Sequence, residues 1–179
     1  DLQEGNKVSR LTYSDDREHA VQWSKNSDAL YFIAGRSGSS QIWRLPLTGG
    51  EARQVTDLPL DVDGFVLSGD ENYLALQLAS KPGCETVACT VEAKQVAAGQ
   101  KDSAMVFDQL MVRHWDTWGD GFRSQLYVAR LGQEKVTEAK NLMPEWNTDI
   151  AGIEQVAFTP DGKNLVFSAK IPGVDQAWH

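Results

Sequence analysis

Short apolar segments alternate with polar turns along most of the chain. The apolar segments are rich in Val, Ile, Leu, Tyr, Phe and Trp, as in ALYFIA (29–34) and QIWRLPL (41–47). Turn residues interrupt them at roughly the 8–12-residue spacing of folds built from short strands. Because β-branched and aromatic residues favour strands and the apolar runs are too short for long helices, the pattern predicts an all-β fold.

One hairpin pattern recurs three times. WSKNSDALYF (23–32), LSGDENYLAL (67–76) and FTPDGKNLVF (158–167) align without a gap. Each has a large apolar residue, Ser or Thr, a polar turn and then an apolar strand. A second element repeats at the same 44-residue distance as the first two copies, since residues 5–12 align with residues 49–56. A period of about 40–45 residues is typical of β-propeller blades.

One repeat reads as a four-stranded antiparallel meander, the unit of a propeller. Its expected strands lie around Val21 and Trp23, over 29–34, over 41–47 and over 51–56. The sequence therefore predicts a partial β-propeller of about three four-stranded antiparallel blades, with one Cys-containing, partly helical insertion. The expected boundaries are the end of one blade at 1–13, a blade at 19–58, a blade at 61–142 with its insertion at 79–108, and the start of a further blade at 153–179.

The insertion and the blade count suggest a larger parent protein. The third hairpin begins 91 residues after the second, at 158 against 67, and TVEAKQVAA (90–98) within the extra segment predicts a short helix. Propellers close with about 4–8 blades, which is more than this chain provides. The chain also starts without Met. We therefore expect a piece of a longer propeller whose exposed blade faces promote self-association when it is isolated.

The composition and net charge of the chain argue against several classes of function. The chain has 41% hydrophobic and 23% charged residues, the balance of a globular protein, and a formal net charge of -8. The negative charge argues against binding to nucleic acid or to anionic lipid. No apolar run approaches the roughly 18–20 residues that span a bilayer. We expect no membrane span, no metal and no cofactor.

The two cysteines lie close together in CETVAC (84–89). Cys84 and Cys89 could form a disulfide, bind a metal or remain as buried thiols. Without a nearby His or Cys cluster they make a poor zinc site. A disulfide would close a small loop, with roughly 2 kcal/mol of stabilisation on a chain-entropy argument. We expect the disulfide, which implies an oxidising compartment and a periplasmic or secreted protein.

RHWDTW (113–118) contains the residues that best suit a binding site. His114 beside Asp116 could form a proton relay or half of a metal site, although an Asp–His hydrogen bond between core tryptophans explains the pair as well. Arg113 could anchor a substrate carboxylate or form a structural salt bridge. With Trp115 and Trp118, these residues are the candidate substrate-binding set.

Two stretches carry a resemblance to a known family. SGSSQIWRLPLTGGEARQVTDLPLDVDGF (37–65) and VFDQLMVRHWDTWGDGFRSQLYVARL (106–131) resemble the propeller of bacterial serine peptidases of the prolyl oligopeptidase family, in particular the dipeptidyl-peptidase and acylaminoacyl-peptidase branch. The resemblance implies an N-terminal propeller that restricts access to oligopeptides. It also implies a C-terminal α/β-hydrolase domain that carries the Ser, Asp and His of the catalytic triad.

The chain itself offers no catalytic residues. Its nearest approach to the G-x-S-x-G nucleophile motif is GRSGS (35–39), which ends in Ser and is expected in a turn between two strands. The sequence therefore predicts the non-catalytic propeller portion of a secreted serine exopeptidase, with the hydrolase domain and an oligopeptide as its partners. The alternative is a protein-binding periplasmic propeller without enzymatic activity, similar to that of the Tol translocation system.

Overall fold

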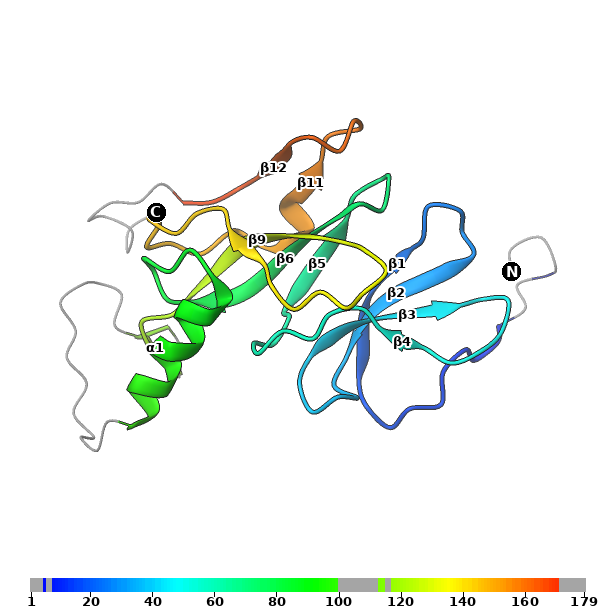
Figure 1. Ribbon diagram of the computed structural model, residues 1–179, viewed down its shortest axis with the longest axis horizontal. Helices are drawn as coiled ribbons and strands as arrows, with labels where there is room; N and C mark the ends of the chain where they lie inside the picture. The colour runs from blue at the N-terminus through cyan, green and yellow to red at the C-terminus, as the bar shows by residue number, and fades with distance from the viewer. Residues whose placement is uncertain (1–4, 6–7, 100–112, 115–116, 171–179) are drawn as a thin grey trace.

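The protein is described here by a computed structural model that covers residues 5, 8–99, 113–114 and 117–170. Two antiparallel four-stranded sheets lie side by side, and a hairpin follows them (Figure 1). The first sheet has the order β1 (Glu18–Trp23), β2 (Ala29–Ala34), β3 (Gln41–Pro46) and β4 (Arg53–Gln54). The second has the order β5 (Gly64–Leu67), β6 (Tyr73–Ser80), β9 (Arg123–Arg130) and β10 (Lys140–Asn141).

The remaining elements extend the second sheet and its insertion. Helix α1 (Val87–Gly99) and the short strands β7 (Arg113–His114) and β8 (Thr117–Trp118) lie between β6 and β9 in sequence. After the second sheet, the 3-10 turn η1 (Ile153–Gln155) leads into the hairpin of β11 (Val156–Phe158) and β12 (Leu165–Phe167). The mostly β fold agrees with the sequence prediction, and the helix expected at 90–98 is confirmed in a longer form.

The second sheet is buried on both faces. Leu74, Leu76 and Leu78 of β6 pack into a core shared with the first sheet, together with Ile33 and Ile42. Intervening residues point the other way, because successive side chains of a strand face opposite sides of its sheet. Ala75 of β6 and Leu126 of β9 belong to a second core, which packs against the β11–β12 hairpin. This explains why β6 reads as a nearly continuous apolar run.

A glutamine joins the first strands of the two sheets. Gln22 of β1 donates from Nε2 to the carbonyl of Phe65 at 2.5 Å, and its Oε1 accepts from the backbone N–H of Leu67 at 3.0 Å. Both partners lie on β5. The Gln22 side chain therefore satisfies a backbone carbonyl and a backbone N–H of the neighbouring sheet, and it connects β1 to β5.

The three hairpins aligned in the sequence form the same turn. Ser24, Ser68 and Thr159 each donate a side-chain hydrogen bond to an aspartate within their own turn, over 2.7, 2.7 and 2.5 Å. The same oxygens accept backbone N–H groups four or five residues later. The fifth residue of each copy adopts a positive φ: 57° at Ser27, 60° at Glu71 and 69° at Gly162. The hairpin repeat read from the sequence is thus a structural repeat.

The N-terminal strand that the repeat predicts does not form in the described residues 8–12. Val8 and Leu11 are 93% and 52% exposed there. A strand is stable only where a neighbouring edge accepts its backbone hydrogen bonds, and within the described chain no edge pairs with this segment. The fourth strand is also shorter than expected, since β4 spans only Arg53–Gln54.

Candidate functional site

Four segments meet at one end of the two sheets. They are the turn between β2 and β3, the linker from the first sheet to the second, the insertion between β6 and β9, and the linker to the final hairpin. We call this set the insertion rim and define it by residues 35–40, 57–63, 81–86, 119–122 and 143–152. It carries the long insertion, and insertions between strands of a rigid sheet are where binding residues concentrate.

A buried glutamine holds the first linker. Gln41, at the start of β3, is 0% exposed and donates from Nε2 to the carbonyls of Leu58 and Leu60, both at 3.0 Å. Its Oε1 accepts the Thr56 hydroxyl at 2.7 Å and the Leu58 N–H at 3.1 Å. The preceding residue, Ser40, accepts from Val62 and donates its N–H to Asp61. The linker is therefore fixed without regular secondary structure of its own.

Gln125, at the start of β9, holds the linker to the final hairpin in the same way. It is also 0% exposed, and its Nε2 donates to the carbonyls of Met143 at 3.2 Å and Trp146 at 2.5 Å. Its Oε1 accepts from Asn141 Nδ2 at 2.8 Å. The preceding Ser124 donates its N–H to Asp149 at 2.6 Å. Two linkers that differ in length and sequence are thus each held by a buried glutamine at the start of a third strand.

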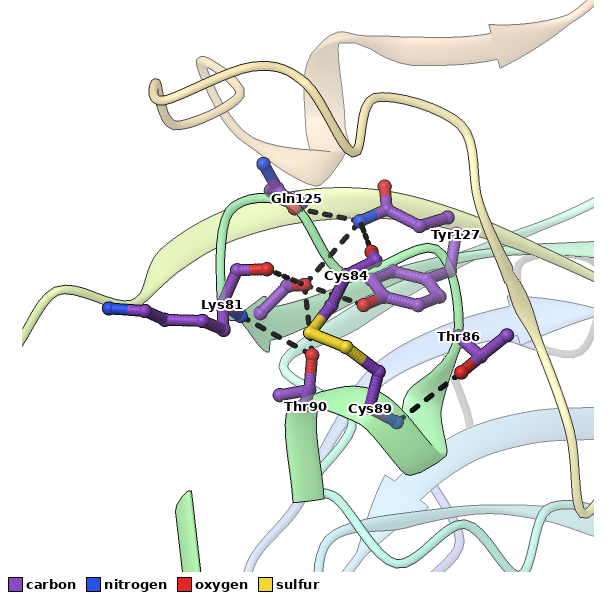
Figure 2. Close-up of a disulfide and its surroundings, with 9 residues drawn as sticks. Lys81, Cys84, Thr86, Cys89, Thr90, Gln125 and Tyr127 are labelled. Atoms are coloured by element: carbon purple, nitrogen blue, oxygen red, sulfur yellow. Dashed lines mark hydrogen bonds between the residues drawn. A yellow bond between two sulfur atoms is a disulfide. The ribbon is translucent and has the colours of Figure 1, made fainter. Parts of the chain in front are cut away.

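The disulfide anchors the insertion to the second sheet (Figure 2). Cys84 and Cys89 are bonded, with their Cα atoms 5.5 Å apart. Asn141 of β10 donates to the Cys84 carbonyl at 2.8 Å. Thr86 precedes α1, and its hydroxyl accepts the N–H of Cys89 at 3.3 Å, as a helix N-cap does. The disulfide predicted from CETVAC is therefore present, and it closes the loop that leads into the helix.

A cluster of buried hydroxyl groups also connects the insertion to the second sheet. Ser80 Oγ lies 2.6 Å from the Tyr127 hydroxyl and 3.2 Å from Thr90 Oγ1 (Figure 2). All three residues are fully buried. Within α1, only Val87 and Thr90 are buried, so the helix is held at its first turn and its later turns project from the sheet (Figure 1).

The predicted substrate-binding residues fall only partly within the described chain. Arg113, His114 and Trp118 are described through their backbone, whereas Trp115 and Asp116 lie outside the described residues. The backbone pairs Arg113 with Trp118, and it pairs His114 with Thr117. Strands β7 and β8 are therefore antiparallel. The role of these residues in binding substrate stays a prediction.

The turn that follows this hairpin contacts the insertion. The ammonium groups of Lys81 and Lys94 lie 5.8 and 5.5 Å from the centre of the Phe122 ring. Lys94 belongs to α1 and Phe122 directly precedes β9. Cation–π contacts of this kind contribute about 0.5–1 kcal/mol at exposed sites. They connect the projecting part of α1 to the approach to β9.

Two further sequence interpretations concern catalysis and metal binding. GRSGS (35–39) joins β2 to β3, with the Gly38 N–H bonded to the Gly35 carbonyl at 2.8 Å, so it is a hairpin turn and not a strand-to-helix nucleophile elbow. In the described part of the chain, no three His, Cys, Asp or Glu side chains converge as metal ligands would.

None of the helices described there is long and apolar enough to cross a membrane.

Sequence analysis missed the two structural glutamines, although a signal was present. SQIW (40–43) and SQLY (124–127) share a Ser-Gln pair followed by an aliphatic and an aromatic residue. The insertion separates these copies by 84 residues, so they fall outside the 44-residue period. Comparing third strands after removal of the insertion would have paired them.

The chain is similar to curated peptidases along almost its whole length, whereas no protein-family model matches it. It is 25% identical over 169 residues to dipeptidyl-peptidase 5 of Porphyromonas endodontalis, which covers 90% of this chain and 23% of the relative. It is 28% identical over 169 residues to peptidase YuxL of Bacillus subtilis, covering 93% of this chain and 24% of the relative. It is 25% identical over 199 residues to a probable dipeptidyl-peptidase 5 of Emericella nidulans, covering 100% of this chain and 26% of the relative.

These similarities support a relationship to a peptidase family. The chain spans about a quarter of the length of the curated relatives it matches.

Proposed function

We propose that this chain is part of the β-propeller of a secreted or periplasmic serine exopeptidase of the prolyl oligopeptidase family. The observation that carries the proposal is the similarity of nearly the whole chain to about a quarter of two dipeptidyl-peptidase 5 sequences and of peptidase YuxL. The repeated sheets support it, because two four-stranded meanders with inner strands β1 and β5 joined by Gln22 are what neighbouring blades require.

In this proposal the chain does not cleave peptides itself. It limits access to a C-terminal α/β-hydrolase domain of the full-length protein and contributes to the oligopeptide-binding cavity. The surface that meets substrate comprises the insertion rim and, as candidate contacts from the segment between β6 and β9, Arg113, His114, Trp115, Asp116 and Trp118. The Cys84–Cys89 disulfide is consistent with the oxidising compartment that the proposal names.

The test compares the full-length protein with the isolated chain 1–179. We expect the full-length protein to release p-nitroaniline from dipeptidyl or acylaminoacyl p-nitroanilides, and a serine-directed fluorophosphonate to abolish this turnover. We expect the isolated chain to show none. A full-length protein without fluorophosphonate-sensitive turnover on either substrate class would refute the peptidase assignment. Turnover by chain 1–179 that the fluorophosphonate blocks would refute the non-catalytic role.

The protein-binding alternative would be favoured by a different outcome. An inactive full-length protein that co-purifies stoichiometrically with another periplasmic protein would support it. The named relatives are peptidases, so the comparisons favour the exopeptidase.

A further inference from the structure

A cleft of about 700 Å3 lies where the two sheets meet. Its walls come from β2–β4 of the first sheet, from the β5–β6 turn and from the loop that follows β9, and the last two lie at the end of the sheets opposite the insertion rim. Ligand-binding clefts in proteins measure about 300–1,000 Å3. The lining includes three cationic side chains, Arg44, Arg53 and Lys135, and two carboxylates, Glu71 and Glu134.

Two of the cations are direct cross-strand neighbours. Arg44 of β3 pairs with Arg53 of β4, and like charges in this position destabilise a sheet. Arg44 has one ion-pair contact, to Asp28 at 3.4 Å, and lies 5.8 Å from the centre of the Tyr31 ring. Arg53 makes no side-chain hydrogen bond or ion pair with any described residue. Of the three cations in the cleft, Arg53 is therefore the one whose charge no described side chain pairs directly.

The second sheet shows that the fold does not require two adjacent arginines at this position. The positions of the second sheet that correspond to Tyr31 and Arg44 are occupied by Ala75 and Val128, and the residue paired with Val128 is Lys140. The equivalent pair there is thus Val–Lys, with a single charge. Because the same meander forms with either set, the two arginines are not needed to build the sheet.

The walls of the cleft are tied together by backbone hydrogen bonds. Val136 N–H donates to the Val55 carbonyl at 2.8 Å, Asp57 N–H donates to the Val136 carbonyl at 2.8 Å, and Leu131 N–H donates to the Asn72 carbonyl at 2.8 Å. The loop after β9 is therefore attached to both sheets. A ligand would enter a preformed site, which reduces the entropy cost of binding.

The lining also offers a neutral donor, and one of its two carboxylates, Glu71, already accepts a hydrogen bond. Burial and the nearby Glu71 raise the pKa of the Tyr31 hydroxyl, against the opposing effect of Arg44, so the phenol stays protonated. Glu71 already accepts the backbone N–H of Lys25 at 2.7 Å. Lys135 contacts Gln54 Oε1 at 2.8 Å and Asp57 at 3.5 Å, which leaves one ammonium proton for a further acceptor.

We propose that this cleft binds a carboxylate group through Arg44 and Arg53, with Lys135 and the Tyr31 hydroxyl as additional donors. Guanidinium groups bind planar carboxylates through two parallel hydrogen bonds, and a carboxylate relieves the repulsion between two neighbouring arginines. The carboxylate is carried by a small dicarboxylate, by the C-terminus of a peptide or by an acidic side chain. The inference is independent of the proposed peptidase activity, because none of the residues that line the cleft belongs to the insertion rim.

Calorimetric titration of the full-length protein at low ionic strength tests the proposal. The probes are succinate, the free acid N-acetyl-Ala-Ala, the amidated peptide acetyl-Ala-Asp-Ala-amide, its neutral analogue with Asn in place of Asp, and inorganic phosphate. We expect at least one of the three carboxylate probes to bind and the neutral peptide not to bind. The carboxylate probe with the lowest Kd identifies the source of the group. Absence of binding by all three, or a lower Kd for phosphate than for each of them, would overturn the proposal.

Variants then locate the site. Arg53→Gln removes the unpaired guanidinium from an exposed position and should raise the Kd at least tenfold, since a hydrogen bond to a charged group contributes about 1.5–3 kcal/mol. Arg53→Lys keeps the positive charge but loses the planar guanidinium that forms two parallel hydrogen bonds, so it should raise the Kd by a smaller factor. Lys140→Gln is the matched control, because it changes the equivalent cross-strand position of the second sheet, and it should leave the Kd unchanged. Equal losses in Arg53→Gln and Lys140→Gln would show that binding is non-specific and would overturn the proposal.

Discussion

Gln41 and Gln125 occupy the same position in the two four-stranded sheets, and each binds the linker that leaves its own sheet. Both follow a serine at the start of the third strand, both are fully buried, and both donate from Nε2 to two linker carbonyls. The linkers share neither length nor sequence. A side chain with two donor hydrogens and an accepting oxygen can satisfy irregular backbone that no neighbouring strand satisfies.

Loss of this glutamine should be strongly destabilising. Gln41→Leu keeps a similar volume but leaves the carbonyls of Leu58 and Leu60 without their donor and the Leu58 N–H without its acceptor. Each buried polar group without a partner costs about 1–3 kcal/mol, so we expect the free energy of unfolding to fall by about 3 kcal/mol or more. Urea denaturation measures it. Gln95→Leu, on the exposed side of α1, is the control and should stay within about 0.5 kcal/mol of the parent.

Two of the three equivalent turns should respond differently to substitution at their fifth residue. Gly162 has φ 69°, so Gly162→Ala should lower the free energy of unfolding by about 1 kcal/mol through backbone strain. Ser27 has φ 57° with a side chain already present, and Ser27→Gly should leave stability unchanged or raise it by up to about 1 kcal/mol. Thermal unfolding of both variants distinguishes them. An unchanged melting temperature for Gly162→Ala would contradict the role of the positive φ.

The disulfide should be formed in the native protein and should stabilise the insertion. We expect alkylation under non-reducing conditions to modify neither Cys84 nor Cys89, as intact mass would show. The double variant Cys84→Ser with Cys89→Ser should lower the free energy of unfolding by roughly 2 kcal/mol on the chain-entropy model. Two alkylated cysteines in native material would reject both the bond and the oxidising compartment inferred from it.

Asp70 should make stability depend on pH in the acid range. Hydrogen bonds from the Ser68 hydroxyl and from Asn72 lower the pKa of Asp70 to about 2, from the ordinary value of 3.8. The folded state therefore favours the carboxylate, and its contribution is complete above pH 3.8 and is lost as the pH falls through about 2.

The stability difference between the parent and Asp70→Ala should accordingly shrink over that interval. Denaturation at a series of pH values measures it, and a difference that stays constant down to pH 2 would disprove the assignment. Asn72→Ala removes the side-chain amide hydrogen bond to the carboxylate and keeps the bond from the backbone N–H, so the pKa of Asp70 should rise part of the way toward its ordinary value.

We also propose that the isolated chain 1–179 self-associates. Val21 and Trp23 of β1 are 58% and 60% exposed, and Val166 of β12 is 64% exposed, so apolar side chains remain uncovered at both ends of the row of sheets. Light scattering should give a mass above that of the 19.8 kDa monomer. The double variant Val21→Ser with Trp23→Ser should reduce association. A stable monomer that melts cooperatively would show that these surfaces need no partner.

The sequence alone predicted the repeated hairpins, the helix in the insertion and the Cys84–Cys89 disulfide, because each depends on neighbours within a few residues. A turn built from Ser or Thr and Asp satisfies its own backbone, and a small cysteine loop needs no distant contact. The nearly continuous apolar run of β6 likewise suits a strand that is buried on both faces.

Only the tertiary structure decided where the linkers are held and which charges meet. Gln41 reads as an ordinary polar residue until Leu58 and Leu60 fold back onto it, and Arg44 and Arg53 become neighbours only through the register of β3 and β4. The segment at 8–12 shows the converse, since its pattern suits a strand but no described edge pairs with it. Hydrogen bonding and electrostatic repulsion act over a few ångströms in space, whatever the separation along the chain.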